Sequence, residues 1–142
     1  MPFVSEPPLG LLDTNVVVHA FANDANSEEC ARHLRALRDG RAQALVEPVV
    51  LHELTYVLPQ FVQQMARRDV SAFLLELVGW EAVRGDKPVL VGALERWRDT
   101  PGLGFVDAYL AALATRRGLP VYTKNIREFA RQRVNVPNPL PT

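Results

Sequence analysis

The sequence predicts an α/β domain built on a mostly parallel sheet. Short apolar segments, bounded by turn residues as buried strands are, alternate along the chain with longer segments of helical periodicity. Strands that alternate with helices in this way form parallel sheets covered by helices. The chain of 142 residues has the length of one ordinary domain, and no segment has the composition of a linker to a second one.

The N-terminal half opens with residues 1–8, which contain three prolines and are expected to form an extended lead-in. Residues 9–13 are apolar and predict a strand buried on both faces. A polar loop follows a first short helix, and the next helix is expected to start at Asn26 or Ser27 and to stop at Gly40, because glycine accepts the left-handed conformation. The other elements expected here are a first helix at 16–21, a strand at 43–47 and helices at 48–58, 61–68 and 71–78.

The C-terminal half continues the alternation with a brief edge strand, an amphipathic helix and a long helix rich in alanine and leucine that Gly118 ends. A proline-rich tail is expected over 137–142, so one domain is predicted over residues 9–136. The elements expected here are strands at 81–83, 119–123 and 134–136 and helices at 86–98, 105–117 and 126–131.

Composition excludes several classes of protein. The chain has 16 basic and 16 acidic residues, so its net charge gives no argument for a nucleic acid partner. No apolar run approaches the roughly 20 residues of a membrane-spanning helix, and the N-terminus lacks the pattern of a signal peptide. The single cysteine, Cys30, excludes an internal disulfide and a multi-cysteine zinc site. These features predict a cytoplasmic protein without a membrane partner.

Three acids stand in apolar surroundings. Asp13 lies between two apolar runs, at the expected end of the first strand. Glu53 has Val49 and Tyr56 as helical neighbours, so its carboxylate is expected to emerge from an apolar stripe. Asp107 lies in the first turn of an apolar helix. For Asp13 and Asp107, the alternative is a structural role as a helix cap or as a charge at the positive end of a helix.

A shared site would change the interpretation of these acids. Three carboxylates brought close together repel one another unless a cation neutralises them. A cluster of oxygen ligands without cysteine favours a hard cation, Mg²⁺ or Mn²⁺. Such a cation activates water and polarises a phosphoryl oxygen, so the pattern predicts metal-dependent chemistry on a phosphate ester.

Four motifs resemble, in order, the four sequence blocks of the PIN domain. They are Leu-Leu-Asp-Thr-Asn at 11–15, His-Glu-Leu-Thr-Tyr-Val-Leu at 52–58, Phe-Val-Asp-Ala-Tyr-Leu-Ala-Ala-Leu-Ala at 105–114 and Val-Tyr-Thr-Lys-Asn-Ile-Arg-Glu-Phe at 121–129. The short chain is similar to the VapC toxins of bacterial toxin–antitoxin modules. The resemblance implies a PIN-like three-layer α/β/α fold and an endoribonuclease that depends on Mg²⁺ or Mn²⁺. It also implies a homodimer that a VapB-like antitoxin inhibits.

The resemblance also assigns roles to residues. Asp13 and Asp107 would be the principal metal ligands, and Glu53 would complete the acidic triad. Asn125 would occupy a fourth position, where its amide can orient a water molecule but cannot ionise. Hydrogen bonds to the acids are expected from Thr14, Asn15 and Thr123. Contacts to the RNA backbone are expected from Lys124, Arg127 and Arg131, for which a solvated helix face is the alternative.

Three other interpretations remain open on the sequence. A receiver-like phosphoacceptor domain would need an acid pair at the first strand, which the chain lacks. A phosphatase of the haloacid dehalogenase type would need an aspartate two residues after Asp13, where Asn15 stands. A catalytically silent PIN-like module that binds RNA or a partner protein is kept open by Asn125.

Overall fold

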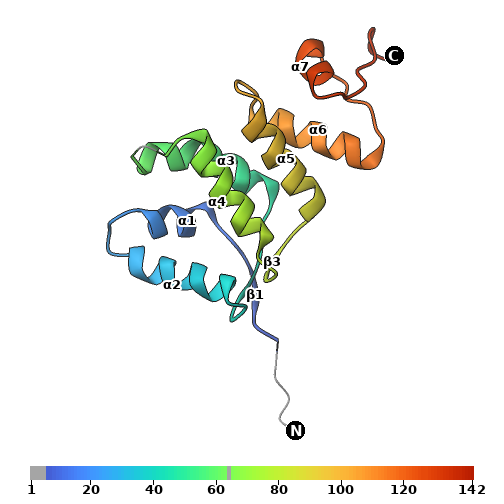
Figure 1. Cartoon of the computed structure of the whole chain (residues 1–142). Helices are drawn as coiled ribbons and strands as arrows, with labels where there is room; N and C mark the ends of the chain where they lie inside the picture. Colours follow the sequence, from blue (N-terminus) through green and yellow to red (C-terminus); the bar gives the residue numbers. More distant parts are fainter. Residues whose placement is uncertain (1–5, 64) are drawn as a thin grey trace. The chain divides into compact units, whose positions relative to one another are not determined.

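The computed structural model describes residues 6–63 and 65–142. The chain divides into two compact units, which we call unit 1 (Met1–Gly85) and unit 2 (Asp86–Thr142) (Figure 1). The predicted lead-in at 1–8 falls partly on residues 1–5, which lie outside the described residues, and residues 6–8 form neither helix nor strand. The predicted domain limits, 9–136 with a tail at 137–142, stay a prediction.

Unit 1 contains a three-stranded parallel sheet in the order β1-β2-β3. Leu9 pairs with Gln43, and Ala44 pairs with Val83. Two helices follow β1 and two follow β2, as parallel neighbours require (Figure 1). The elements of unit 1 are β1 (Leu9–Leu11), α1 (Thr14–Phe21), α2 (Ser27–Arg38), β2 (Gln43–Leu45), α3 (Pro48–Phe61), α4 (Arg67–Gly79) and β3 (Val83–Arg84).

Strand β1 differs from its prediction, because its side chains are exposed. Leu11 is 75% exposed, and Leu9 is exposed as well. The expectation of a strand buried on both faces is therefore wrong for these residues. Within unit 1, β1 is an edge strand of the sheet, and burial is concentrated in the central β2 and in the helices, for example at Ala44 and Leu51.

Two helix boundaries in unit 1 also correct the prediction. Helix α3 continues through Pro59 to Phe61, because a proline in the last turn removes one backbone donor without ending the flanking hydrogen bonds. The helices predicted at 61–68 and 71–78 are replaced by the single helix α4, and Gln64 of the first one lies outside the described residues. Asp69 accepts a hydrogen bond from the Ala66 backbone N–H at 3.0 Å, so it starts α4 and does not separate two helices.

Unit 2 is helical in its described part. Helix α5 (Lys87–Asp99) packs against α6 (Phe105–Arg117), and α7 (Ile126–Arg131) follows after an extended segment. Gly118 ends α6 with a φ of 64°, as predicted. A small core formed by Ala111, Ala114, Phe129 and Val134 holds α7 against α6.

The strands predicted at 119–123 and 134–136 do not form in unit 2. The two segments are extended, and Val121 donates one backbone hydrogen bond to the Asn135 carbonyl at 3.0 Å. A strand requires a ladder of such bonds, and one bond does not make a ladder. The two apolar segments therefore do not form strands with each other. None of the described helices combines the length and apolar character that crossing a membrane requires.

A polar network in unit 2 joins its three helices. The half-buried Arg96 of α5 donates to the Gln132 carbonyl and to Thr115 Oγ1 of α6, both at 3.1 Å. Gln132 is buried and donates from its amide nitrogen to Thr100 Oγ1 at 3.0 Å. Gln132, directly after α7, is thus hydrogen-bonded both to α5 and to Thr100, which follows α5.

Candidate active site

The structure brings two of the candidate site residues together in unit 2. Asn125 donates from its side-chain nitrogen to Asp107 Oδ2 at 3.5 Å, a long and weak hydrogen bond. Asp107 lies in the first turn of α6 and is partly buried, whereas Asn125 is exposed at the N-terminal boundary of α7. Thr123 Oγ1 accepts a hydrogen bond from the Asn125 backbone N–H at 2.9 Å, which orients this end of the segment.

Local sequence explains why this pair forms. Gly104 precedes α6 and starts the helix, which places Asp107 in its first turn, where a negative charge is favoured. Phe129 is buried one turn after Asn125 and anchors α7 in the small core. The arrangement gives a carboxylate beside an amide at an accessible surface.

In unit 1, Asp13 occupies the junction between β1 and α1. Its backbone is extended, with φ −90° and ψ 149°, and its carbonyl accepts from the Val16 N–H at 3.2 Å. The Asp13 carboxylate is exposed and makes no capping hydrogen bond. The role of a side-chain cap, which the sequence left open, is therefore not the one that this carboxylate performs.

Glu53 lies on α3, which packs against α1. Its side chain is half-buried and has no hydrogen-bond or ion-pair partner in the part of the chain that the structure describes. The expected apolar stripe around Glu53 is present, but Val49 and Tyr56 are exposed. Glu53 therefore emerges from an exposed apolar face of α3 and not from a buried one.

The remaining candidates differ in their surroundings. Thr14 is buried, and its hydroxyl oxygen has no hydrogen-bond partner among residues 6–63 and 65–142. Asn15 is exposed beside Asp13. Lys124 and Arg127 are exposed and form no ion pair within the described chain, whereas Arg131 Nη1 lies 3.5 Å from Glu128 Oε2. Of the three predicted RNA contacts, Arg131 is thus the one with an internal partner.

The donor set has the chemistry of a site for a hard cation. Asp13, Glu53 and Asp107 offer carboxylate oxygens, and the Asn125 amide can offer its oxygen after a turn of the side chain. Mg²⁺ and Mn²⁺ prefer oxygen ligands, so these residue types fit the implied metal. Within each unit taken alone, no three His, Cys, Asp or Glu residues gather in the described part to hold a metal ion.

The loop between α1 and α2 contains a short contact between a histidine and an aspartate. His19 Nδ1 lies 2.7 Å from Asp24 Oδ2, and this hydrogen bond holds the pKa of Asp24 below its usual value. The Ser27 hydroxyl donates to the Ala22 carbonyl at 2.6 Å and accepts from the Asp24 N–H. Burial raises the pKa of the nearby Cys30 thiol, so that thiol is protonated at neutral pH. These groups organise a loop.

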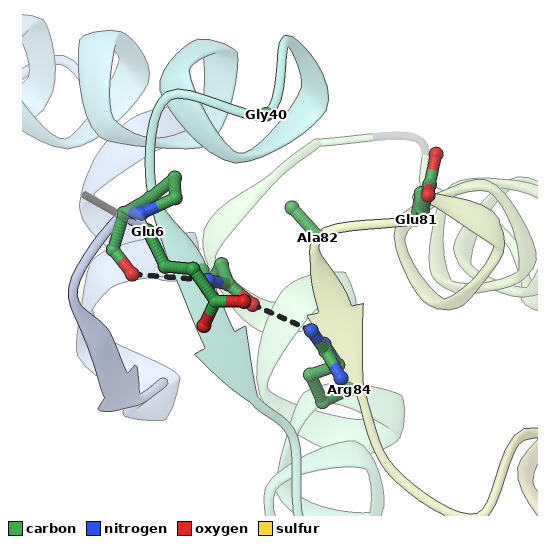
Figure 2. A pocket seen from close by; sticks show the side chains of 7 residues that line it. Glu6, Gly40, Glu81, Ala82 and Arg84 are labelled. Carbon is green, nitrogen blue, oxygen red and sulfur yellow. Dashed lines mark hydrogen bonds between the residues drawn. The ribbon is translucent and has the colours of Figure 1, made fainter. Parts of the chain in front are cut away.

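A hollow of about 310 Å³ lies at the start of β2 and β3 (Figure 2). Arg84 donates to Gln43 Oε1 at 2.9 Å, and Gln43 in turn donates to the Pro7 carbonyl at 2.9 Å. Ligands of parallel sheets bind beyond the carboxyl ends of the strands, where Asp13 lies. This hollow lies at the opposite end of the strands, and its Pro7, Gln43 and Arg84 groups already bond to one another, so it is not the candidate site.

The distribution of charge between the two units was not predicted from the sequence. Residues 1–85 contain seven Lys and Arg against eleven Asp and Glu, whereas residues 86–142 contain nine against five. The neutral chain therefore combines a unit of charge −4 with a unit of charge +4.

A sequence model of the PIN domain matches residues 10–134, which include all the candidate site residues. The chain belongs to the PIN-domain family. Searches of curated proteins and of solved structures gave no match. The predicted α/β fold class is confirmed, because the chain has a PIN domain with a parallel sheet, consistent with three α/β/α layers. PIN domains are generally nucleases, often metal-dependent ribonucleases, so the chain has a nuclease-like fold.

Proposed function

We propose that this PIN domain is an endoribonuclease that hydrolyses RNA phosphodiester bonds and depends on Mg²⁺ or Mn²⁺. The observation that carries the proposal is the Asp107–Asn125 pair, 3.5 Å apart at an accessible surface of a PIN-domain chain. A carboxylate and an amide at the start of two successive helices suit the binding of a cation and of water.

The proposed roles follow from the chemistry of each side chain. Asp13 and Asp107 hold the metal, and Glu53 adds the third carboxylate. When bound, the metal lowers the pKa of a water molecule and polarises a phosphoryl oxygen. Asn125 orients the attacking water by hydrogen bonds, and being neutral it takes no proton from that water.

Neighbouring side chains support these groups. Thr123 already fixes the Asn125 backbone. We propose that Thr14 and Asn15 bond to the acids of the loaded site, because the Thr14 hydroxyl is buried without a partner in the described chain. Lys124 and Arg127 are exposed and available to phosphates, whereas Arg131 would first have to leave Glu128.

We further propose that the protein is the toxin of a toxin–antitoxin pair, of the VapC type. This proposal rests on the resemblance of the four motifs and on the short chain. It includes a cytoplasmic location, a homodimer and a VapB-like antitoxin that binds and inhibits the enzyme. Co-purification with the product of a small reading frame directly upstream, together with loss of cleavage in the complex, is the expected result. An active enzyme without such a partner would contradict the toxin role and leave the nuclease.

The test of the nuclease proposal is an RNA cleavage assay with the full chain. We expect cleavage with Mg²⁺ or Mn²⁺, none in EDTA, and a loss of about 100-fold or more in Asp13→Asn and Asp107→Asn. Glu76→Gln is the matched control, because Glu76 is an exposed acid of α4 without a partner in the described residues. Folded variants that cleave as fast as the parent would contradict the assigned site.

Asn125 gives a specific reason to test a second function. A neutral amide at this position is also compatible with a PIN-like module that binds RNA or a partner protein without cleaving it. Such a module would bind RNA equally well in EDTA and produce no fragments with either metal. Metal-dependent cleavage by purified protein would exclude it.

A further inference from the structure

Unit 2 contains a hollow of about 280 Å³ at the C-terminal end of α6. Its lining includes Thr115 of α6, Gly118 directly after that helix, the exposed Leu119, and Arg133 and Asn135 beyond α7. No carboxylate lines this hollow. Its polar lining groups are a guanidinium, a hydroxyl and an amide, all of which can donate hydrogen bonds to an anion.

Arg133 has an unusual backbone for its residue type. Its φ is 61°, in the left-handed region where glycine or asparagine is the common choice at the end of a helix. Three hydrogen bonds hold this turn: the Arg133 N–H donates to Ala130, the Val134 N–H donates to Phe129, and Arg96 donates to the Gln132 carbonyl, all at 3.0–3.1 Å. The end of α7 explains the conformation, but it does not explain why an arginine occupies it.

Basic residues adjoin the lining residues of the hollow along the chain. Arg116 and Arg117 lie between two of its lining residues in the last turn of α6, and both are exposed without an ion pair in the described chain. Arg96 donates to Thr115 from the other side. Basic residues also stabilise the carbonyl end of a helix, which is the structural alternative for Arg116 and Arg117. That alternative predicts an effect on stability and none on binding.

An aromatic side chain lies between the hollow and the Asp107–Asn125 pair along the chain. The extended segment from Leu119 leads through Tyr122, which is 65% exposed, to Asn125. Single-stranded nucleic acids are bound by guanidinium groups at the phosphates and by aromatic rings on which bases stack. Leu119 of the hollow, the exposed Tyr122 and Asn125 of the acid–amide pair follow one another in this order along one segment of unit 2.

We propose that this hollow and Tyr122 bind the backbone and a base of single-stranded RNA that extends from the Asp107–Asn125 pair toward the C-terminal end of α6. Arg133, with Arg116 and Arg117, contacts phosphates, and Tyr122 stacks on a base. The inference rests on the proposed ribonuclease function and specifies how its substrate is held. An exposed phenol ring distinguishes this surface from one suited only to an acidic peptide, because a ring offers a base a stacking partner.

The experiment measures RNA affinity at several salt concentrations. The full chain with Asp107→Asn, in EDTA to prevent cleavage, is titrated onto a fluorescein-labelled oligouridylate, and Kd is obtained from anisotropy. Arg133→Gly is the key variant, because glycine keeps the left-handed turn while the side chain with its guanidinium is removed. We expect a severalfold higher Kd, a slope of log Kd against log salt that is smaller by about 0.7, and a melting temperature that does not fall. Arg133→Lys should restore most of the slope.

Two further variants complete the design. Tyr122→Ala should raise Kd about fivefold or more with an unchanged salt slope, since it removes stacking and no charge. Arg35→Ala is the matched control, because Arg35 of α2 is an exposed arginine without an ion pair in the described part of unit 1. It should leave Kd and the slope unchanged.

The outcomes separate the inference from the proposed function. If Arg133→Gly and Arg35→Ala affect RNA binding equally, or if Arg133→Gly weakens binding of polyglutamate but not of RNA, the inference is wrong while cleavage by the parent still supports the nuclease. If the parent does not cleave RNA but these variants lose RNA affinity as expected, the nuclease proposal fails and the binding surface stands.

Discussion

The two units of this chain differ in secondary structure and in net charge. Unit 1 contains the parallel sheet, carries a charge of −4 and holds Asp13 and Glu53, whose carboxylates have no partner in the described residues. Unit 2 is helical where described, carries a charge of +4 and already pairs Asp107 with Asn125. A net charge of zero therefore says little about the surfaces that a nucleic acid would meet.

The two units also hold their candidate residues in different ways. In unit 1 the two acids lie on regular elements: Asp13 at the end of a strand and Glu53 on the face of a helix. In unit 2 the pair depends on a six-residue helix, α7, which is too short to be stable alone and is held by Phe129 and by the Arg96 network. Unit 2 should therefore be the more sensitive of the two to changes distant from the candidate site.

Phe129→Ala should have the largest effect on stability. Phe129 is buried in the small core that holds α7, so its removal should cost about 3–5 kcal/mol of unfolding free energy. Phe61→Ala is the control, since Phe61 is exposed at the end of α3 and should change stability by no more than about 0.5 kcal/mol. Urea denaturation of both variants measures the difference, and equal losses would contradict the role of the core.

Arg96→Met should have the second largest effect on stability. It leaves the buried Gln132 carbonyl and the Thr115 hydroxyl without their donor, at a cost of about 1–3 kcal/mol. Arg98→Met removes an exposed arginine of the same helix, which pairs with Asp99 at 2.7 Å, and should change stability much less than Arg96→Met. If both substitutions shift the melting temperature equally, the network does not hold α7.

Asn125→Asp should make unit 2 sensitive to metal. The new carboxylate would repel Asp107, and two charges about 4 Å apart in water repel by about 1 kcal/mol. We expect a lower melting temperature in EDTA and a larger rise on addition of Mn²⁺ than in the parent. A melting temperature that is unchanged in both conditions would mean that the two side chains do not share an environment.

The smallest effect is expected from the loop of unit 1, and it depends on pH. The hydrogen bond with His19 lowers the pKa of Asp24 in the folded state below its usual 3.8. The stability that this provides is present above pH 3.8 and is lost as the pH falls through the lowered pKa. The parent should therefore exceed Asp24→Asn in melting temperature at neutral pH, and the gap should narrow below pH 3.8. A gap that does not change with pH would contradict this origin.

Elements with strong local signals were predictable from the sequence. The amphipathic pattern of α5, the glycine that ends α6 and the short α7 all lie where periodicity and capping placed them. The strands expected at 119–123 and 134–136 do not form within unit 2, because a short apolar segment does not show whether a partner strand pairs with it. The exposure of β1 was missed for the same reason, since its place at an edge depends on the order of strands.

The candidate site was predictable only in part. Motif resemblance selected Asp107 and Asn125, 18 positions apart, and no spacing rule would have shown that they lie 3.5 Å from each other. Arg133 carries no sequence signal, because its left-handed backbone results from the way α7 ends and from the Arg96 hydrogen bond. The charge division between the units was visible in the sequence, but only once a boundary near residue 85 was known.

We propose that Asp13 and Asp107 take part in one metal-dependent reaction. Calorimetric titration of Mn²⁺ into the parent, Asp13→Asn, Asp107→Asn and the double variant, with Glu76→Gln as control, tests it most directly. We predict that each single substitution abolishes the tight binding that the parent and the control show, and that the double variant loses nothing more. Tight binding that survives in either single variant, or losses that add up in the double variant, would contradict a shared site.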